Sequence, residues 1–284
     1  MPARPRESTL TTLSAFAALP MSAEDHSEGG FHPPGIYEFF PYAWTFNGEP
    51  VFDRIMFVRL VAMAALLVVF VLFVQRSRLV PSRFTNSVEL MLDLVRTQIA
   101  EQILGVKDGR RFLPLLATLF FMIFALNITG VIPGLNIGGT SVVGVPLLLA
   151  LIYYVTFIVV GIRAQGVGGY LKSNLFPPGV PKFLYVLVTP IEFASTFLIR
   201  PFSLTIRLLA NLIAGHLLLV LCFSATDFFF RQAISGEAIG VFFLLTLVAG
   251  FAFTLFEILV AVLQAYIFSL LTAVYISGAL HPEH

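Results

Sequence analysis

Five long apolar regions, separated by short polar segments, dominate the chain from residue 55 onward. They lie at about 55–75, 112–132, 144–162, 183–226 and 239–280. Each of the first three has roughly the 20 residues that a helix needs to cross a 30 Å hydrocarbon core. This pattern predicts a protein whose main solvent is the lipid bilayer.

The last two apolar regions are too long for an ordinary crossing. As a helix each would extend about 60 Å, which is about twice the thickness of the hydrocarbon core. The region 239–280 contains neither proline nor a polar turn, and 183–226 contains Pro190 and Pro201 but no loop. We therefore expect each to form one long, strongly tilted helix that a partner shields from lipid.

The segment 86–104 has the period of an amphipathic helix, because its apolar residues form one stripe and its charges lie opposite. Asn86 with Glu89 three positions later suggests a capping pair, and Gly105 can end the helix. We expect this helix at the cytoplasmic interface. The fold predicted is an all-α integral membrane protein with three ordinary transmembrane helices, this interfacial helix and the two long tilted ones.

Residues 1–54 show no sustained apolar period, so we expect an extracytoplasmic N-terminal segment, 1–54, and a single membrane domain, 55–284. Cytoplasmic loops are enriched in Lys and Arg. The segments 76–111 and 163–182 carry seven and three such residues, whereas 133–143 carries none. This asymmetry predicts an N-terminus outside the cell and a C-terminus in the cytoplasm.

Composition supports the membrane assignment and excludes several other classes. Hydrophobic residues make up 58% of the chain and charged residues 12%, against about 25% charged in soluble domains. The net charge of +1 gives no electrostatic case for binding nucleic acid. The single cysteine, Cys222, cannot form an internal disulfide, and the tail histidines have no metal-ligand spacing. The glycines at 166–169 follow no strand, so they predict a turn, and we expect neither a metal site nor a cofactor.

Charged residues inside the two long apolar regions are the main candidates for function. There are four, Glu192, Arg200, Arg207 and Glu257, and His216 adds a titratable group. A charge at the bilayer centre costs several kcal/mol and usually marks a transport pathway or an ion pair. For Glu192 and Arg200, near the expected cytoplasmic end, a structural salt bridge or snorkelling stays an alternative. Arg207 lies too deep in its helix to snorkel easily.

Helix geometry groups these candidates. At 100° per residue, one face of the helix, an arc of about 80° around its axis, carries Arg200, Ser203, Arg207, Asn211 and Ala214. His216 lies on the opposite side of this helix. On the last helix, Glu257 and Gln264 share a face and can line one polar track. Because Asn211 and Gln264 need polar partners in a bilayer, we expect water or Arg207 to supply them.

Two motifs carry a family resemblance. Residues 203–216 (SLTIRLLANLIAGH) and 257–268 (EILVAVLQAYIF) closely resemble signatures of subunit a of F-type ATP synthases. The resemblance implies a non-catalytic proton-channel subunit of the bacterial cytoplasmic membrane, whose two long helices form a hairpin against a ring of c subunits. It also implies contact with the subunit b peripheral stalk and the rest of the synthase. Protons are expected as the transported ion rather than sodium, since the chain offers no evident sodium cage.

The resemblance assigns roles residue by residue. It makes Arg207 the essential charge facing the ring carboxylates, between two offset aqueous half-channels. It places Asn211, His216, Glu257 and Gln264 chiefly along the outer half-channel, and Ser203 and Glu192 near the cytoplasmic exit. Secondary candidates are Arg200 and Tyr266.

Two departures from the family pattern are visible. Many bacterial relatives have an acid where His216 stands and a histidine where Glu257 stands, so the exchange here keeps one proton-binding pair. Glu192 lies eight residues before Arg200, one more than in many relatives.

Other classes remain as alternatives. A secondary transporter also buries charges at the midplane, but usually through inverted repeats with paired broken helices, and no such repeat is found in this sequence. A stand-alone ion channel would need a symmetric pore lining, and a structural scaffold would have no need of Arg207.

Overall fold

The computed structural model describes residues 44–46, 49–52, 54–76, 82–132, 135, 137–176 and 182–280. Within these residues, five helices are long and apolar enough to cross a membrane. The chain is therefore a multi-pass membrane protein. Most of the expected N-terminal segment 1–54 and the tail 281–284 lie outside the described residues.

Two short strands depart from the all-α expectation. The strands β1 (Trp44–Phe46) and β2 (Glu49–Phe52) pair as an antiparallel hairpin in which Trp44 lies opposite Phe52. Helix α2 (Arg54–Arg76) follows and packs on α4 and α3. Its apolar side chains occur all round the helix, with Val58 buried and Leu67 and Val74 exposed, as is typical of a span that faces lipid.

The expected amphipathic helix is part of a longer helical stretch. Helix α3 (Arg83–Asp93), a π-helical stretch (Leu94–Glu101) and α4 (Gln102–Ile128) follow one another without a loop. The stretch breaks at Gly105, where φ is 74° and ψ is 168°, so the expected end at this glycine is confirmed. The expected capping pair Asn86 and Glu89 is wrong, because Ser82 is the N-cap and its Oγ accepts a hydrogen bond from the Thr85 amide at 3.3 Å.

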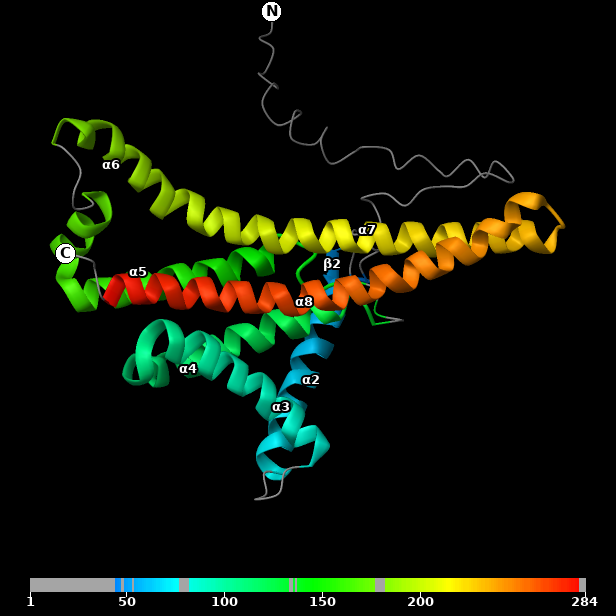
Figure 1. Ribbon diagram of the computed structural model, residues 1–284, viewed down its shortest axis with the longest axis horizontal. Coiled ribbons are helices and arrows are strands. Elements are labelled where there is room, and N and C mark those ends of the chain that lie inside the picture. Colours follow the sequence, from blue (N-terminus) through cyan, green and yellow to red (C-terminus); the bar gives the residue numbers. More distant parts are fainter. Residues whose placement is uncertain are drawn as a thin grey trace, which may run out of the picture. The chain divides into compact units, whose positions relative to one another are not determined.

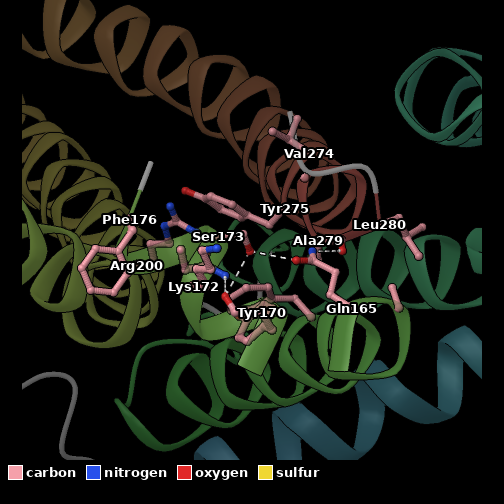
Figure 2. Close-up of a pocket in the computed structure, with 15 residues that line it drawn as sticks. Gln165, Tyr170, Lys172, Ser173, Phe176, Arg200, Val274, Tyr275, Ala279 and Leu280 are labelled. Carbon is pink, nitrogen blue, oxygen red and sulfur yellow. Dashed lines mark hydrogen bonds between the residues drawn. The ribbon is translucent and has the colours of Figure 1, made fainter. Parts of the chain in front are cut away.

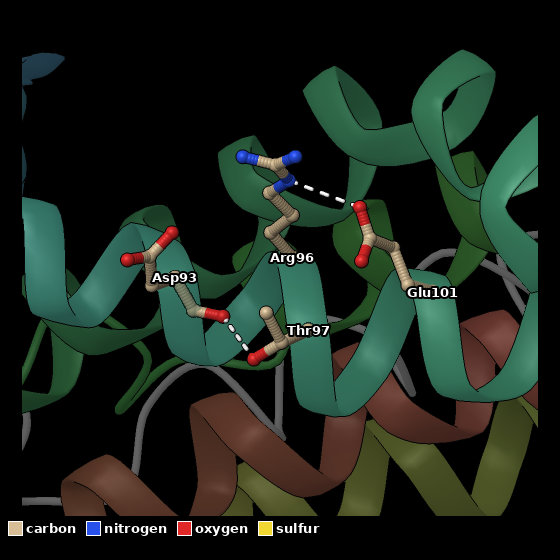
Figure 3. Close-up of polar contacts among 4 residues, drawn as sticks. All are labelled: Asp93, Arg96, Thr97 and Glu101. Carbon is tan, nitrogen blue, oxygen red and sulfur yellow. Dashed lines mark hydrogen bonds and ion pairs between the residues drawn. The ribbon is translucent and has the colours of Figure 1, made fainter.

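Side chains support the backbone of the π-helical stretch, as Figure 3 shows. The Thr97 hydroxyl donates to the Asp93 carbonyl at 2.6 Å, and the Arg96 Nε atom lies 3.0 Å from a Glu101 carboxylate oxygen. The apolar stripe faces inward, with Val88, Val95 and Ile99 buried. The charged face is therefore exposed, as the sequence pattern predicts.

Helix α5 (Gly144–Leu175) extends past the expected end at residue 162. It changes direction at Gly166, where φ is 74° and ψ is 162°, so the glycine-rich segment does contain the predicted turn, at its first glycine. Beyond this break the chain returns toward the first part of α5. The ring of Tyr170 packs directly on Gly161, at a place where a Cβ atom would collide with it.

The two longest apolar regions form two long helices that run side by side (Figure 1). One consists of α6 (Tyr185–Ala194), a π-helical turn (Ser195–Ile199) and α7 (Arg200–Ile234), and the other is α8 (Phe242–Leu280). The first continues to Ile234 rather than ending near residue 226. An ion pair at 3.0 Å between Arg231 and Asp227, one helical turn apart, stabilises this extension.

Helix α8 also packs along α4 and α5, and the core lies between these elements. Small residues such as Ala265 and Ala273 are fully buried on α8 and allow close helix approach. Two hydroxyls of α8 reach carbonyls of the α3–α4 stretch, Ser269 to Leu116 at 3.4 Å and Ser277 to Ile103 at 3.2 Å. These contacts hold α8 between α7 and the α3–α4 stretch and leave one side of α7 uncovered by the described residues.

Candidate functional site

Arg207 lies on the uncovered side of α7. Ser203, Arg207 and Ala214 are exposed, whereas Leu204 and Leu208 on the other side are buried against the core. The part of the predicted face at Ser203 and Arg207 therefore points away from the other described helices of this chain, whereas Arg200 and Asn211 are partly buried. The buried leucines fix the rotation of the helix, because turning Arg207 inward would bring them out.

Arg207 has no ionic partner among the described residues. The two ion pairs found there, Arg96 with Glu101 and Arg231 with Asp227, lie elsewhere. No described hydrogen bond involves the Arg207 side chain either. A guanidinium on an apolar helix needs water or an opposite charge, and a partner for this one has to come from outside the described part of the chain.

Arg200, on the same helix, has a different environment. Its guanidinium carbon lies 4.6 Å from the centre of the Tyr275 ring on α8, and the side chain is partly buried. A cation over an aromatic face is a favourable contact worth about 0.5–2 kcal/mol. This geometry favours the structural alternative for Arg200, as a link between α7 and α8.

Glu257 is buried on α8, with 8% of its surface exposed. Its carboxyl group lies between two glycines. A Cβ atom placed on Gly215 of α7 would be 2.8 Å from Oε1, and one placed on Gly130, after α4, would be 3.7 Å from the same atom. The other oxygen, Oε2, is buried and has no hydrogen-bond partner among the described residues. A buried polar atom left in this way is costly and often marks a functional position.

A cavity of about 140 Å³ opens beside Glu257, and we call it the Glu257 cavity. It brings Asn211 of α7 next to Glu257 of α8, two of the predicted residues. The remaining lining residues are Ala214, Gly215, Leu218, Phe253, Phe256 and Val260. Because the walls carry polar groups from both helices, the cavity has the size and chemistry to hold several water molecules.

A buried polar cluster, which the sequence reasoning missed, lies between α4 and α5. It consists of Asn127, Thr129, Thr140 and Ser141. The Thr140 hydroxyl donates to Asn127 Oδ1 at 2.7 Å, and the Thr129 hydroxyl accepts from the Gly139 amide at 3.1 Å. One signal could have found it: an asparagine within an apolar span needs a partner, and the following turn supplies hydroxyls.

Close contacts join this turn to the helices around it. Arg59 of α2 donates from Nε to the Gly139 carbonyl at 2.8 Å. Gly138 packs directly on the Leu212 side chain of α7, and Gly130 faces Glu257. The turn therefore packs on α7 at Leu212 and on α8 at Glu257, next to the Glu257 cavity.

The other predicted residues fall into separate places. His216, 5% exposed, is buried on α7, on the side away from Arg207. Gln264 and Tyr266 of α8 are partly buried outside the Glu257 cavity, and Tyr266 packs against the core. The structure therefore separates an outward pair, Ser203 and Arg207, from an inward pair, Asn211 and Glu257.

Glu192 is partly buried on α6, and the π-helical turn Ser195–Ile199 separates it from Arg200. Within this turn the Arg200 amide reaches back to the Ser195 carbonyl. A π-helical turn takes up one more residue than an α-helical turn. It therefore takes up one residue between Glu192 and Arg200, which is the amount by which this spacing is expected to exceed that of many relatives.

Within the described residues, no group of three or more His, Cys, Asp or Glu side chains has the geometry to hold a metal ion. The polar groups of the site are amide, imidazole, carboxyl and guanidinium. Such an arrangement can exchange protons with water and hold a fixed positive charge.

Comparisons with known proteins show the family of the chain. The family model described as "ATP synthase A chain" matches residues 56–277. A protein of Rhodococcus erythropolis named ATP synthase subunit a is 48% identical over 254 residues, which cover 89% of this chain and 92% of that protein. The protein of the same name from Pseudarthrobacter chlorophenolicus is 37% identical over 270 residues, covering 94% of this chain and 98% of its own. The chain therefore belongs to the family of ATP synthase A chains, also called subunit a.

Proposed function

We propose that this chain is the proton-channel subunit of an F-type ATP synthase, in which Arg207 separates two offset aqueous half-channels. The observation that carries the proposal is the exposed Arg207 on an apolar helix, without an ionic partner in the described chain. A ring of c subunits, each with a carboxyl group, would supply the missing negative charge. The α7–α8 hairpin would lie against this ring with the Ser203–Arg207 side facing it.

A charged guanidinium suits this role for a physical reason. A ring carboxyl group that faces lipid is neutral, because a bare carboxylate there is costly. Opposite Arg207 the same group is stabilised as a carboxylate and gives up its proton. The arginine keeps its own proton, so it cannot pass protons directly between the half-channels. Each proton that crosses contributes about 2.3 kcal/mol per 100 mV, and this energy turns the ring.

The Glu257 cavity supports an assignment to the outer half-channel. Asn211 and Glu257 line it. His216 is buried directly after Gly215 of this lining, and Gly130, next to Thr129 of the buried polar cluster, approaches Glu257. Protons would pass along water and these side chains to a ring carboxyl group. Gln264 would extend this path along α8, and Ser203 and Glu192 would line the cytoplasmic exit.

The proposed function also implies a membrane orientation, partner subunits and a transported ion. The N-terminus would lie outside the cytoplasmic membrane and the C-terminus in the cytoplasm. The amphipathic helix α3 would lie at the cytoplasmic interface of the membrane. The subunit b stalk and the catalytic head would complete the complex, and catalysis would take place on other chains. Protons rather than sodium ions would be transported, without a metal or organic cofactor.

A secondary transporter or an ion channel is a weaker candidate. Either would place its charged residues around a pathway inside the chain. Here Arg207 is exposed on the outside of the packed helices, where it needs a second protein.

The decisive experiment replaces Arg207 in the assembled synthase. We expect Arg207→Lys to abolish proton-driven ATP synthesis in reconstituted vesicles, because a desolvated lysine can lose its proton and is a poorer barrier. The matched control is Arg231→Lys, an exposed residue of the same helix whose partner is Asp227, and it should retain synthesis. Normal synthesis by Arg207→Lys would reject the proposed role. Purification of the chain without a c ring would reject the proposed complex.

A further inference from the structure

A second and larger cavity, of about 940 Å³, lies where the last parts of α5 and α8 meet the start of α7. We call it the α5–α8 cavity. Its polar and aromatic lining includes Gln165, Tyr170, Lys172, Ser173, Arg200 and Tyr275 (Figure 2). The proton pathway proposed above uses none of these residues except, as a secondary candidate, Arg200.

The charge of the α5–α8 cavity is positive. Lys172 and Arg200 line it, and its fifteen lining residues include no aspartate or glutamate. The Arg200 guanidinium carbon lies 4.6 Å from the centre of the Tyr275 ring, and no hydrogen bond or ion pair among the described residues uses its N–H groups. Guanidinium N–H groups in one plane suit the oxygens of a phosphate group.

One wall of the cavity is built rigidly. The Ser173 hydroxyl donates to Gln165 Oε1 at 2.9 Å, and Gln165 Nε2 donates to the Ala279 carbonyl at 2.7 Å (Figure 2). Asn174 Nδ2 donates to the Tyr170 carbonyl at 2.9 Å. The Gln165–Ala279 bond ties the end of α5 to the end of α8, and the other two hold the end of α5 together, so the wall is formed before any ligand arrives.

Tyr170 adds a buried donor to the cavity. Its side chain is 2% exposed, and its hydroxyl is buried without a hydrogen-bond partner among the described residues. A buried hydroxyl that gives up its hydrogen bonds to water costs about 1–3 kcal/mol, and a ligand oxygen would satisfy it.

The rim of the cavity is apolar and exposed. Phe176 and Val274 line it with 45% and 43% of their surfaces exposed. Tyr170 and Tyr275 also line the cavity, and tyrosine is a residue type enriched at the level of lipid headgroups. Basic pockets between membrane helices at this level commonly bind phosphate headgroups.

We propose that the α5–α8 cavity binds the phosphate group of an anionic ligand, through Lys172, Arg200 and the Tyr170 hydroxyl. The apolar rim favours a phospholipid as the source, with its acyl chains against Phe176 and Val274. Free phosphate offers the same oxygens and is the other source to test. The site does not depend on proton transport, so it can be tested separately from the function proposed above.

The test uses the whole synthase, delipidated in a neutral detergent and titrated with labelled phosphatidylglycerol, phosphatidylcholine or inorganic phosphate. We expect Lys172→Gln to weaken phosphatidylglycerol binding about five- to tenfold. We expect a further loss when Arg200→Gln is added. Tyr170→Phe keeps the ring packed on Gly161 and removes only the hydroxyl, so a loss of several-fold is expected. The matched control is Arg163→Gln, an exposed cation of α5 that does not line the cavity.

Each outcome decides a specific point. Loss of one bound phosphatidylglycerol per complex in Lys172→Gln, but not in Arg163→Gln, supports a lipid site. Loss of one bound phosphate with unchanged lipid supports the site with free phosphate as its source. The phosphate sites of the catalytic head are the same in all variants and cancel in this comparison. Unchanged binding of both ligands, or equal binding of phosphatidylcholine, overturns the proposal.

Discussion

The Glu257 carboxyl group of α8 lies against the backbone of Gly215 in α7. A Cβ atom on Gly215 would be only 2.8 Å from Glu257 Oε1. The two long helices approach closely at the level of a buried acidic group, and only a residue without a side chain fits there. The absence of a side chain at Gly215 therefore leaves the space that the Glu257 carboxyl group occupies beside the Glu257 cavity.

We expect Gly215→Ala to displace the Glu257 carboxyl group by a few tenths of an ångström and to disturb the water beside it. Overpacking of this kind costs about 1–3 kcal/mol, and proton-driven ATP synthesis is expected to fall about fivefold or more. The measurement is the rate of synthesis in vesicles, normalised to the amount of assembled complex. Gly168→Ala is the control, because a Cβ atom at this helical position meets no atom within 4 Å, and its rate should match that of the native complex.

Replacing the carboxyl group itself separates packing from proton exchange. Glu257→Gln keeps the shape of the side chain but cannot take up or release a proton. If Glu257 passes protons, this variant lowers passive proton flow through the membrane sector at least about tenfold. This loss is smaller than the rate factor of about 10²–10⁴ that a positioned proton-transfer group contributes. The complex should assemble normally. Glu89→Gln, at an exposed position of α3, is the control, and equal proton flow in the two variants would argue against the assigned role.

The hydrogen bond between Thr140 and Asn127 is expected to stabilise the turn beside Glu257. Thr140→Val keeps the shape and leaves the buried Asn127 oxygen without this donor, which costs about 1–3 kcal/mol. We expect a lower midpoint of thermal unfolding for the subunit in detergent. Thr156→Val removes a hydroxyl that bonds only within its own helix, to the Ile152 carbonyl at 2.7 Å, and should change the midpoint little. Equal midpoints for the two variants would contradict this prediction.

The orientation of α7 can be tested by cross-linking to the ring. A cysteine at Ala210 or Ala214, both exposed beside Arg207, is expected to form a disulfide with a cysteine on the facing helix of a c subunit. A cysteine at Leu212, which is buried against the core, should not. Efficient cross-linking from position 212 but not from 210 would mean that another face of α7 meets the ring.

The long helices were predictable because their signal is local. An apolar run without a polar turn determines both the element and its rough extent, and the rotation of α7 follows from the spacing of Arg207 and its neighbours. The end of the helix at Ile234 was missed because residues 227–234 are more polar. The ion pair of Asp227 and Arg231 one turn apart and the packing of Gly240 on Ala233 both accompany this extension. The cap at Ser82 was missed because Asn86 and Glu89 offered an equally good local pattern.

Contacts between distant segments could not be read from the sequence in the same way. Arg200 and Tyr275 lie 75 positions apart, and nothing local to either indicates the other. The approach of Gly130 and Gly215 to Glu257 depends on how three helices pack. Asn127 and Thr140 pair across a turn without charged side chains, so neither stands out in a search for charges in apolar segments. The family resemblance supplied roles for single residues, and packing supplied their neighbours.

The outward position of Arg207 has a consequence for the stability of the chain before it assembles with its partners. If Arg207 faces a ring as proposed, a copy without this ring carries a permanent charge on a surface that meets the acyl chains, and such a charge costs several kcal/mol. We expect such a copy to insert α7 poorly and to be degraded quickly. Surplus subunits would then be removed by membrane quality control, and their abundance would follow that of the ring without any separate regulation.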